Sequence, residues 1–152
     1  MDDIFAAVHA QSPPGVTLEI PPKVFRDMHG ELIDYVRNVS LRASFPAFER
    51  YAGPTGMVQG GIISAMFDNS FGPFSYLVAK KPCATITLDV HFMRPAPVDG
   101  ERLTVDVYLR TKSRTVLFMD GEMTNQRGKT VARATTTLAI LRPPTREGES
   151  KG

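Results

Sequence analysis

The sequence is poor in cysteine and has no long hydrophobic run. Its 152 residues include one cysteine and no tryptophan. The lone Cys83 excludes an intramolecular disulfide and a thiolate cluster for zinc or iron–sulfur, as is typical of proteins from a reducing compartment. No segment approaches the roughly 18 consecutive apolar residues of a membrane span, and the amino end has no basic region of the kind that opens a secretory signal. The sequence therefore predicts a cytoplasmic protein without membrane contact.

An excess of charge of one sign is also missing. The 18 Lys and Arg against 16 Asp and Glu give a formal charge of +2. The basic residues are scattered, apart from the cluster Arg110, Lys112 and Arg114, so no basic stripe is present and we expect no nucleic-acid partner. The three histidines share no spacing typical of a metal pair, and we expect no metal site.

The sequence divides into three parts, and its length suits one domain with a real core. Residues 1–30 form an N-terminal extension. We expect a short helix at its apolar patch, then a loop with two proline clusters, and a brief helix over 22–29 that Gly30 closes. Residues 31–142 carry the regular periodic patterns of the main domain. Residues 143–152 are polar and rich in Pro and Gly, and we expect this tail to be disordered.

The main domain combines one long helix with several strands. Residues 32–48 are strand-like but broken, with a clean alternation from Val39 to Phe45. A helix begins near Gly60; its apolar residues lie on every side, which predicts burial, and Pro73 should bend or interrupt it. Alternating strands follow over 84–92, 103–109, 116–123 and 130–141. We predict an α+β protein, a curved antiparallel sheet around one central helix.

Asp68 is the residue of this helix that most needs an explanation. A carboxylate buried among apolar side chains is costly unless a partner compensates for the lost water. In a structural interpretation, Asp68 caps a helix break near Gly72 and Pro73, or hydrogen-bonds to Asn69 or Ser70. In a functional interpretation, the acid is kept for catalysis. This residue alone does not separate the two.

The start of the same helix favours the functional interpretation. The first amides of a helix have no intrahelical acceptor and attract negative charge, and the glycines Gly60 and Gly61 let a ligand approach them closely. They would suit the oxyanion of a thioester under attack, although a tight turn alone would also explain them. Asp68 lies eight residues further on, about 12 Å along a helix. We therefore hypothesise that Asp68 of one subunit serves Gly60 of another across a twofold axis, in a homodimer or a dimer of dimers.

A resemblance gives this hypothesis a family. The run Gly56-Met57-Val58-Gln59-Gly60-Gly61, with an acid nine residues after Gln59, resembles the active-site signature of hotdog-fold acyl-CoA thioesterases of the phenylacetate-degradation and hydroxybenzoyl-CoA type. The later run Phe92-Met93-Arg94-Pro95-Ala96 is similar to the rest of that domain, and the match spans roughly residues 35–141.

The resemblance implies a hotdog fold, hydrolysis of acyl-CoA thioesters and a set of catalytic residues. It implies that Asp68 is a general base, or a nucleophile that forms an anhydride, and that Gly60 donates its amide to the thioester oxygen. Thr85 corresponds to a hydroxyl that helps to hold the attacking water. Two positions depart from the family pattern. Gln59 stands where many relatives have His; some thioesterases of this class use Gln there, so we keep Gln59 as a catalytic candidate whose amide orients the carbonyl or the donor loop. Gly53 stands where relatives often have Asn.

The same resemblance implies how substrate is bound. We expect Gly61, Asn69 and Phe71 to bind substrate, with Phe74 and Tyr76 as further lining of an acyl tunnel, although Phe71 and Phe74 could equally belong to the core. Arg94, Lys112 and Arg114 are weak candidates for the CoA phosphates, because a solvated surface charge is the more common role of such residues. Coenzyme A belongs to the substrate, so no separate cofactor is expected.

Two other functions stay open. One is an enoyl-CoA hydratase or dehydratase on the same fold, against which the lack of a histidine near Gln59 or Asp68 in the sequence argues. The other is a non-catalytic protein that binds acyl-CoA or a similar ligand, which the departures at Gln59 and Gly53 favour.

Overall fold

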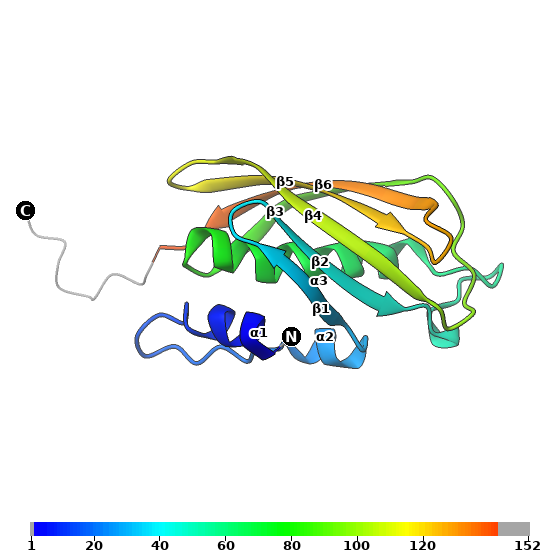
Figure 1. The fold of residues 1–152 in the computed structure, drawn as a ribbon, viewed down its shortest axis with the longest axis horizontal. Helices are drawn as coiled ribbons and strands as arrows, with labels where there is room; N and C mark the ends of the chain where they lie inside the picture. Colours follow the sequence, from blue (N-terminus) through cyan, green and yellow to red (C-terminus); the bar gives the residue numbers. More distant parts are fainter. Residues whose placement is uncertain (1, 143–152) are drawn as a thin grey trace, which may run out of the picture.

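The computed structural model describes residues 2–142 and consists of one antiparallel sheet and three α-helices (Figure 1). The proposed tail over 143–152 lies outside the described residues. In chain order the elements are α1 (Asp2–His9), α2 (Lys23–Asp27), β1 (Glu31–Val36), β2 (Ser40–Pro46), the 3-10 helix η1 (Glu49–Tyr51), α3 (Gly60–Ala79), β3 (Cys83–Phe92), β4 (Arg102–Lys112), β5 (Val116–Thr124) and β6 (Thr130–Ile140).

The sheet wraps around α3, as the sequence predicted (Figure 1). Its strand order is β1-β2-β4-β5-β6-β3, and every neighbouring pair is antiparallel. The strand that follows the helix in sequence is therefore at one edge of the sheet, and β1 is at the other. Within residues 2–142, no helix is long and apolar enough to span a membrane.

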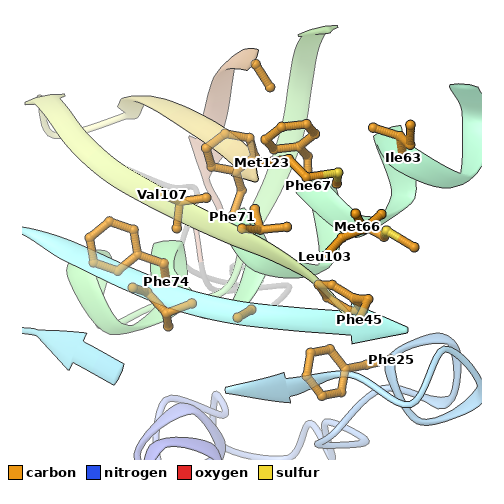
Figure 2. Packing of buried hydrophobic residues seen from close by; sticks show 14 of the residues in the cluster. Phe25, Phe45, Ile63, Met66, Phe67, Phe71, Phe74, Leu103, Val107 and Met123 are labelled. Carbon is orange, nitrogen blue, oxygen red and sulfur yellow. The ribbon is translucent and has the colours of Figure 1, made fainter. Parts of the chain in front are cut away.

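Aromatic side chains of α3 form the centre of the core (Figure 2). Phe67, Phe71 and Phe74 are fully buried, and Phe67 stacks on Phe71 with ring centroids 6.1 Å apart. The sheet makes room for them at Gly121 of β5, where an added Cβ would lie 3.2 Å from each of these two rings. A small residue in the strand thus lets the two large rings pack directly against the sheet.

The structure decides two points that the sequence left open in the first half of the domain. The segment 32–48 is a hairpin of two strands, β1 and β2, because Asn38 adopts a left-handed conformation (φ 58°) and turns the chain. Asparagine tolerates this region better than most residues. Pro73 does not interrupt α3, which continues to Ala79 with Pro73 buried inside it.

The N-terminal extension is folded against the domain and contains two helices. α1 confirms the predicted first helix and contacts α3, and both short helices lie below α3 in Figure 1, whereas β5 and β6 lie above it. The second predicted helix is also present, as α2. Its end differs from the prediction: His29, not Gly30, takes the positive φ of 51°.

Gly30 has a packing role instead. A Cβ at Gly30 would lie 2.7 Å from Phe25 Cζ and 2.7 Å from Phe45 Cε1. Phe25 and Phe45 meet edge to face at 5.6 Å, which joins the N-terminal extension to β2 (Figure 2). The glycine thus lets the extension reach the core.

We predict that Gly30→Ala destabilises the protein by about 1–3 kcal/mol, the usual cost of overpacking a core. Gly53→Ala is a matched control, because its Cβ would meet only Met57 O, at an ordinary 3.8 Å. Chemical denaturation of both variants measures the difference. Equal free energies of unfolding for the two variants would contradict this prediction, because they would mean that the rings of Phe25 and Phe45 move aside without loss of stability.

Candidate active site

Asp68 is exposed in the single chain, which corrects the prediction that it is buried. α3 does bury the side of the helix that carries Phe67, Phe71 and Phe74. Its other side carries Gly61, Ala65, Asp68, Gly72 and Tyr76, which are exposed or half-buried. These positions recur every three or four residues and so form one face, called here the outer face of α3. Gly61, Ala65 and Gly72 count as apolar in a sequence pattern, but they have little or no side chain to bury in a core.

Thr85 on β3 is the direct partner of Asp68. Its hydroxyl Oγ1 donates a hydrogen bond of 2.8 Å to Asp68 Oδ1. The structure thus brings together two residues that lie 17 positions apart and that the resemblance had assigned to catalysis. This bond fixes one carboxylate oxygen, so Oδ2 remains available for water. The structural interpretation proposed Asn69 or Ser70 as the partner of Asp68, but neither bonds to it. The side chain of Asn69 donates to Ala65 O, and that of Ser70 donates to Met66 O.

A β-bulge in β3 aims Thr85 at the helix. Thr85 pairs with Leu138 of β6 and Thr87 pairs with Thr137, so Ile86 is an extra residue. The alternation predicted Ile86 on the inward face with Leu88 and Val90, whereas Ile86 is 57% exposed. The extra residue reverses the alternation. Thr85, and not Ile86, therefore points toward α3. Bulges often re-aim a side chain in this way near functional sites.

The amino end of α3 presents two amides without acceptors. Gln59 is the N-cap residue and gives no side-chain cap; its own amide donates to Tyr51 O at 2.9 Å. The amides of Gly60 and Gly61 have no acceptor within residues 2–142. A Cβ on Gly61 would meet nothing within 4 Å, whereas one on Gly60 would lie 3.1 Å from Phe92 Cζ. An anion could approach this helix end from the open side of Gly61.

An apolar cavity of about 200 Å³ lies beside the Asp68–Thr85 pair. Asn69 and Tyr76 line it, as the sequence predicted for the acyl site. Phe71 does not: it is fully buried under β5 and belongs to the core, and Phe74 is fully buried too. Sequence reasoning missed the remaining walls of the cavity, for which the sequence carries no local signal. They are Phe5, Val8, Ile20, Pro22, Gly72, Pro73, Cys83 and Leu138.

Two titratable groups in this cavity stay neutral near pH 7. Burial raises the pKa of the Tyr76 hydroxyl, with a smaller contribution from Cys83. Burial also raises the pKa of the Cys83 thiol, against smaller lowering effects of its hydrogen bond to Ser75 and of Lys112. The thiol is therefore a weak nucleophile at neutral pH. Asp68 is the only carboxylate among the described residues that lines the cavity.

The cations proposed for CoA lie at opposite ends of the domain. Arg94 follows β3, near the amino end of α3, and lines a hollow of about 380 Å³ with Arg102, Arg127 and Lys129. Lys112 lies at the other end, where its Nζ donates to Val78 O in the last turn of α3 at 3.0 Å. Arg114 makes no hydrogen bond or ion pair within residues 2–142. These residues therefore do not form one phosphate site in a single chain, and their contact with CoA stays a prediction.

The described residues hold no group of three or more His, Cys, Asp or Glu side chains that could bind a metal ion. No histidine lines the cavity beside Asp68. The polar groups available there are the carboxylate of Asp68, the hydroxyls of Thr85 and Tyr76, the amide of Asn69 and the neutral thiol of Cys83. Two helix amides lie further along α3.

Solved structures with this fold are plentiful. The PaaI protein of the Escherichia coli phenylacetic acid degradation operon is similar with a TM-score of 0.75 and 16% identity, over 80% of this chain and 86% of that protein. A phenylacetic acid degradation-related protein from Ralstonia eutropha JMP134 has a TM-score of 0.72 and 28% identity, with 81% and 92% covered. A Streptococcus mutans protein solved with acetyl-CoA has a TM-score of 0.71 and 17% identity, with 84% and 96% covered.

These similarities confirm the hotdog fold, a curved antiparallel sheet around one helix. The chain has no match among curated proteins. The thioesterase superfamily model, however, matches residues 55–132, just over half of the chain. The chain therefore belongs to the thioesterase superfamily. The matched segment contains Gln59, Gly60, Asp68 and Thr85.

The position of Lys112 allows a direct test of its structural role. We expect Lys112→Met to lower the free energy of unfolding by about 0.5–1.5 kcal/mol, because a carbonyl at the end of α3 loses its charged donor. Arg114→Met, its neighbour without a partner, should change it by less than about 0.5 kcal/mol. Thermal or urea unfolding measures both. No difference between the variants would contradict a capping role for Lys112.

Proposed function

We propose that the protein hydrolyses acyl-CoA thioesters to a carboxylic acid and CoA, with Asp68 as the reacting carboxylate. The observation that carries this proposal is the 2.8 Å hydrogen bond from Thr85 to Asp68 at the edge of an apolar cavity. Asp68 acts either as general base toward water or as nucleophile. In both routes water supplies the hydroxyl of the acid product, the carbon–sulfur bond breaks, and the CoA sulfur leaves as a thiolate that takes up a proton.

The acyl oxygen is proposed to bind at the amino end of α3. Negative charge develops on this oxygen during attack, and the amides of Gly60 and Gly61 are unused donors at the positive end of a helix dipole. Gln59 is exposed and its side chain makes no hydrogen bond within residues 2–142, so its amide group is available to orient the thioester. The sulfur of the substrate would then point away from the apolar cavity.

One chain cannot bring these groups together. Asp68 and Gly60 are eight residues apart on a continuous helix, about 12 Å along its axis. A base must lie within about 3 Å of the water that it activates. We therefore propose that a second copy supplies the helix amino end, so that each site combines Asp68 of one subunit with Gly60 of the other.

The exposed edge of the sheet supports self-association. β3 is ten residues long, has no partner on its outer side within residues 2–142, and exposes Ile86 and Phe92 by 57% and 55%. Long apolar edge strands are usually paired, because their open backbone groups bind other strands. Pairing β3 with β3 of a second copy would bury this edge next to Thr85. It would also bring a second outer face of α3, with its small residues, toward the first.

The lack of a histidine near Asp68 argues against the hydratase alternative. His9, His29 and His91 all lie outside the cavity, whereas a hydratase on this fold would need an acid–base partner for the carboxylate. Non-catalytic binding of acyl-CoA is the remaining alternative, and the first experiment below distinguishes it from hydrolysis.

We predict that Asp68→Asn lowers kcat/KM about 10²–10⁴-fold, the range for removal of a positioned base. Thr85→Val, which removes the hydroxyl at nearly constant shape, should cost about tenfold, and Thr85→Ser should restore most of this loss. Release of CoA thiol from an acyl-CoA panel measures the rates. Binding of acyl-CoA by the wild type without any thiol release would reject the proposal in favour of a binding protein.

The shared site predicts complementation between two inactive variants. Gly60→Pro removes the amide donor at the first helical position, where proline fits, and Gln59 already has the extended conformation that a following proline requires (φ −64°, ψ 142°). Gly60→Ala is the control, because it adds a similar Cβ near Phe92 but keeps the amide. Each of Gly60→Pro and Asp68→Asn alone should be inactive.

A heterodimer of the two inactive variants contains one doubly altered site and one intact site. We therefore expect about half of the wild-type activity from the isolated heterodimer, obtained by co-expression with two different tags. A site built within one chain predicts no recovery. A heterodimer as inactive as its parents would thus contradict the sharing while leaving the role of Asp68 intact.

A further inference from the structure

The N-terminal segment, residues 2–30, forms a wall of the cavity beside Asp68. Phe5 and Val8 of α1, together with Ile20 and Pro22 before α2, line the cavity along with Thr85 and Leu138 of the sheet. Phe5 and Val8 are 8% and 2% exposed. The walls of this cavity therefore come from two regions far apart in sequence, the segment and the α3–β3 unit that carries Asp68.

Two residues of this wall form a partition. Phe5 and Ile20 line both the cavity beside Asp68, of about 200 Å³, and a larger hollow of about 650 Å³ on their other side. The hollow is otherwise bounded by residues of the same segment, Ala6, His9, Pro21, Phe25, Arg26 and Gly30. Phe5 and Ile20 therefore lie between the two spaces, and a shorter side chain at either position would leave more room at this end of the cavity.

Aromatic contacts hold the partition in place. Phe5 meets Phe25 edge to face at 5.1 Å, and Phe25 meets Phe45 of β2 at 5.6 Å. Arg50 of η1 donates to Asp27 O at 2.6 Å, which holds the end of α2. The chain of rings links α1 through α2 to the sheet, so the wall has the support of the core behind it.

The cavity is small and partly open to solvent. A cavity of about 150 Å³ holds one benzene ring, so about 200 Å³ suits an acyl group of about that size with one or two further carbons. At the end formed by the partition, a longer alkyl chain would meet the side chains of Phe5 and Ile20. The lining is apolar apart from Asp68 and a few polar groups, so a compact apolar group fits its chemistry.

We propose that the N-terminal segment sets the upper size limit of the acyl group, with Phe5 and Ile20 as the specificity-determining residues. The accepted class is compact apolar acyl groups, either one aromatic ring or a short chain. The inference rests on the proposed function in so far as the bound group is the acyl part of an acyl-CoA. It goes beyond that function because it assigns selectivity to a segment outside the α3–β3 unit that carries the reacting groups.

The first experiment measures hydrolysis of benzoyl-, hexanoyl- and hexadecanoyl-CoA. Wild type should prefer the two compact substrates, and Phe5→Ala and Ile20→Ala should each raise the ratio of kcat/KM for hexadecanoyl-CoA over hexanoyl-CoA about tenfold or more. Val24→Ala is the control, because Val24 lies in the same segment, is 54% exposed and lines neither space. The proposal is overturned if Phe5→Ala and Ile20→Ala both show the same ratio of kcat/KM for hexadecanoyl-CoA over hexanoyl-CoA as Val24→Ala.

The second experiment reads binding without catalysis. Cys83 is the single cysteine of the chain and lines the cavity, so its alkylation reports occupancy. Labelling is done above about pH 8.5, because the raised pKa of this thiol keeps it protonated and slow at neutral pH. The probes are non-hydrolysable thioethers, S-benzyl-CoA and S-hexadecyl-CoA.

S-benzyl-CoA should protect Cys83 in the wild type, whereas S-hexadecyl-CoA should protect it only in Phe5→Ala or Ile20→Ala. Protection that follows this pattern without any thioester hydrolysis would sink the proposed function and keep the size limit. Equal protection of the wild type by both thioethers, or by neither, would overturn the size limit whatever the activity. Ile20→Ala keeps the test valid if Phe5→Ala fails to fold, because it leaves the Phe5–Phe25–Phe45 contacts unchanged.

Discussion

The rigidity of α3 is the constraint on which the candidate site depends. A continuous helix of 20 residues, anchored in the sheet by its buried phenylalanines, fixes Asp68 about 12 Å from the amides at its own amino end. Neither a loop movement nor a side-chain rotation shortens that distance. Chemistry that needs both a carboxylate and an oxyanion donor at one carbonyl must therefore take one of them from elsewhere. The exposed β3 edge, directly beside Thr85, lies where a second copy would supply it.

The sheet determines which way the catalytic candidates point. Without the extra residue at Ile86, β3 would present an isoleucine to α3 at this level and turn Thr85 away from Asp68. The bulge weakens the ladder locally, because one residue is left unpaired. In exchange, Thr85 is placed 2.8 Å from Asp68 Oδ1 by a strand and a helix, the two most rigid elements available. A hydroxyl held in this way orients the carboxylate better than one on a loop would.

The sequence predicted the strands, the helix and their order, because alternation and helical periodicity depend only on local spacing. It also assigned Asp68 and Gly60 to one site through the spacing after Gln59, and Thr85 through the resemblance to a family. It was wrong about Asp68 being buried. The pattern counted the glycines and the alanine of the outer face as apolar, but these small residues leave Asp68 exposed to water. The sequence left the place of Phe71 open, because the choice between core and cavity depends on the curvature of a sheet formed by distant residues. The turn at Asn38 escaped notice because the residues on both sides of it continue a strand-like composition.

The outer face of α3 is divided between two tasks. The N-terminal segment covers the part near Gly72 and Tyr76, and its side chains line the cavity there. The part near Gly61 has no cover within residues 2–142 and stays accessible to a second copy. Because the two parts lie more than two helical turns apart, the wall that limits the acyl group and the contact that would complete the oxyanion site involve different residues. A change in the segment can therefore alter the accepted acyl size without moving Gly60, Asp68 or Thr85. Selectivity and chemistry are thus free to vary separately in this fold.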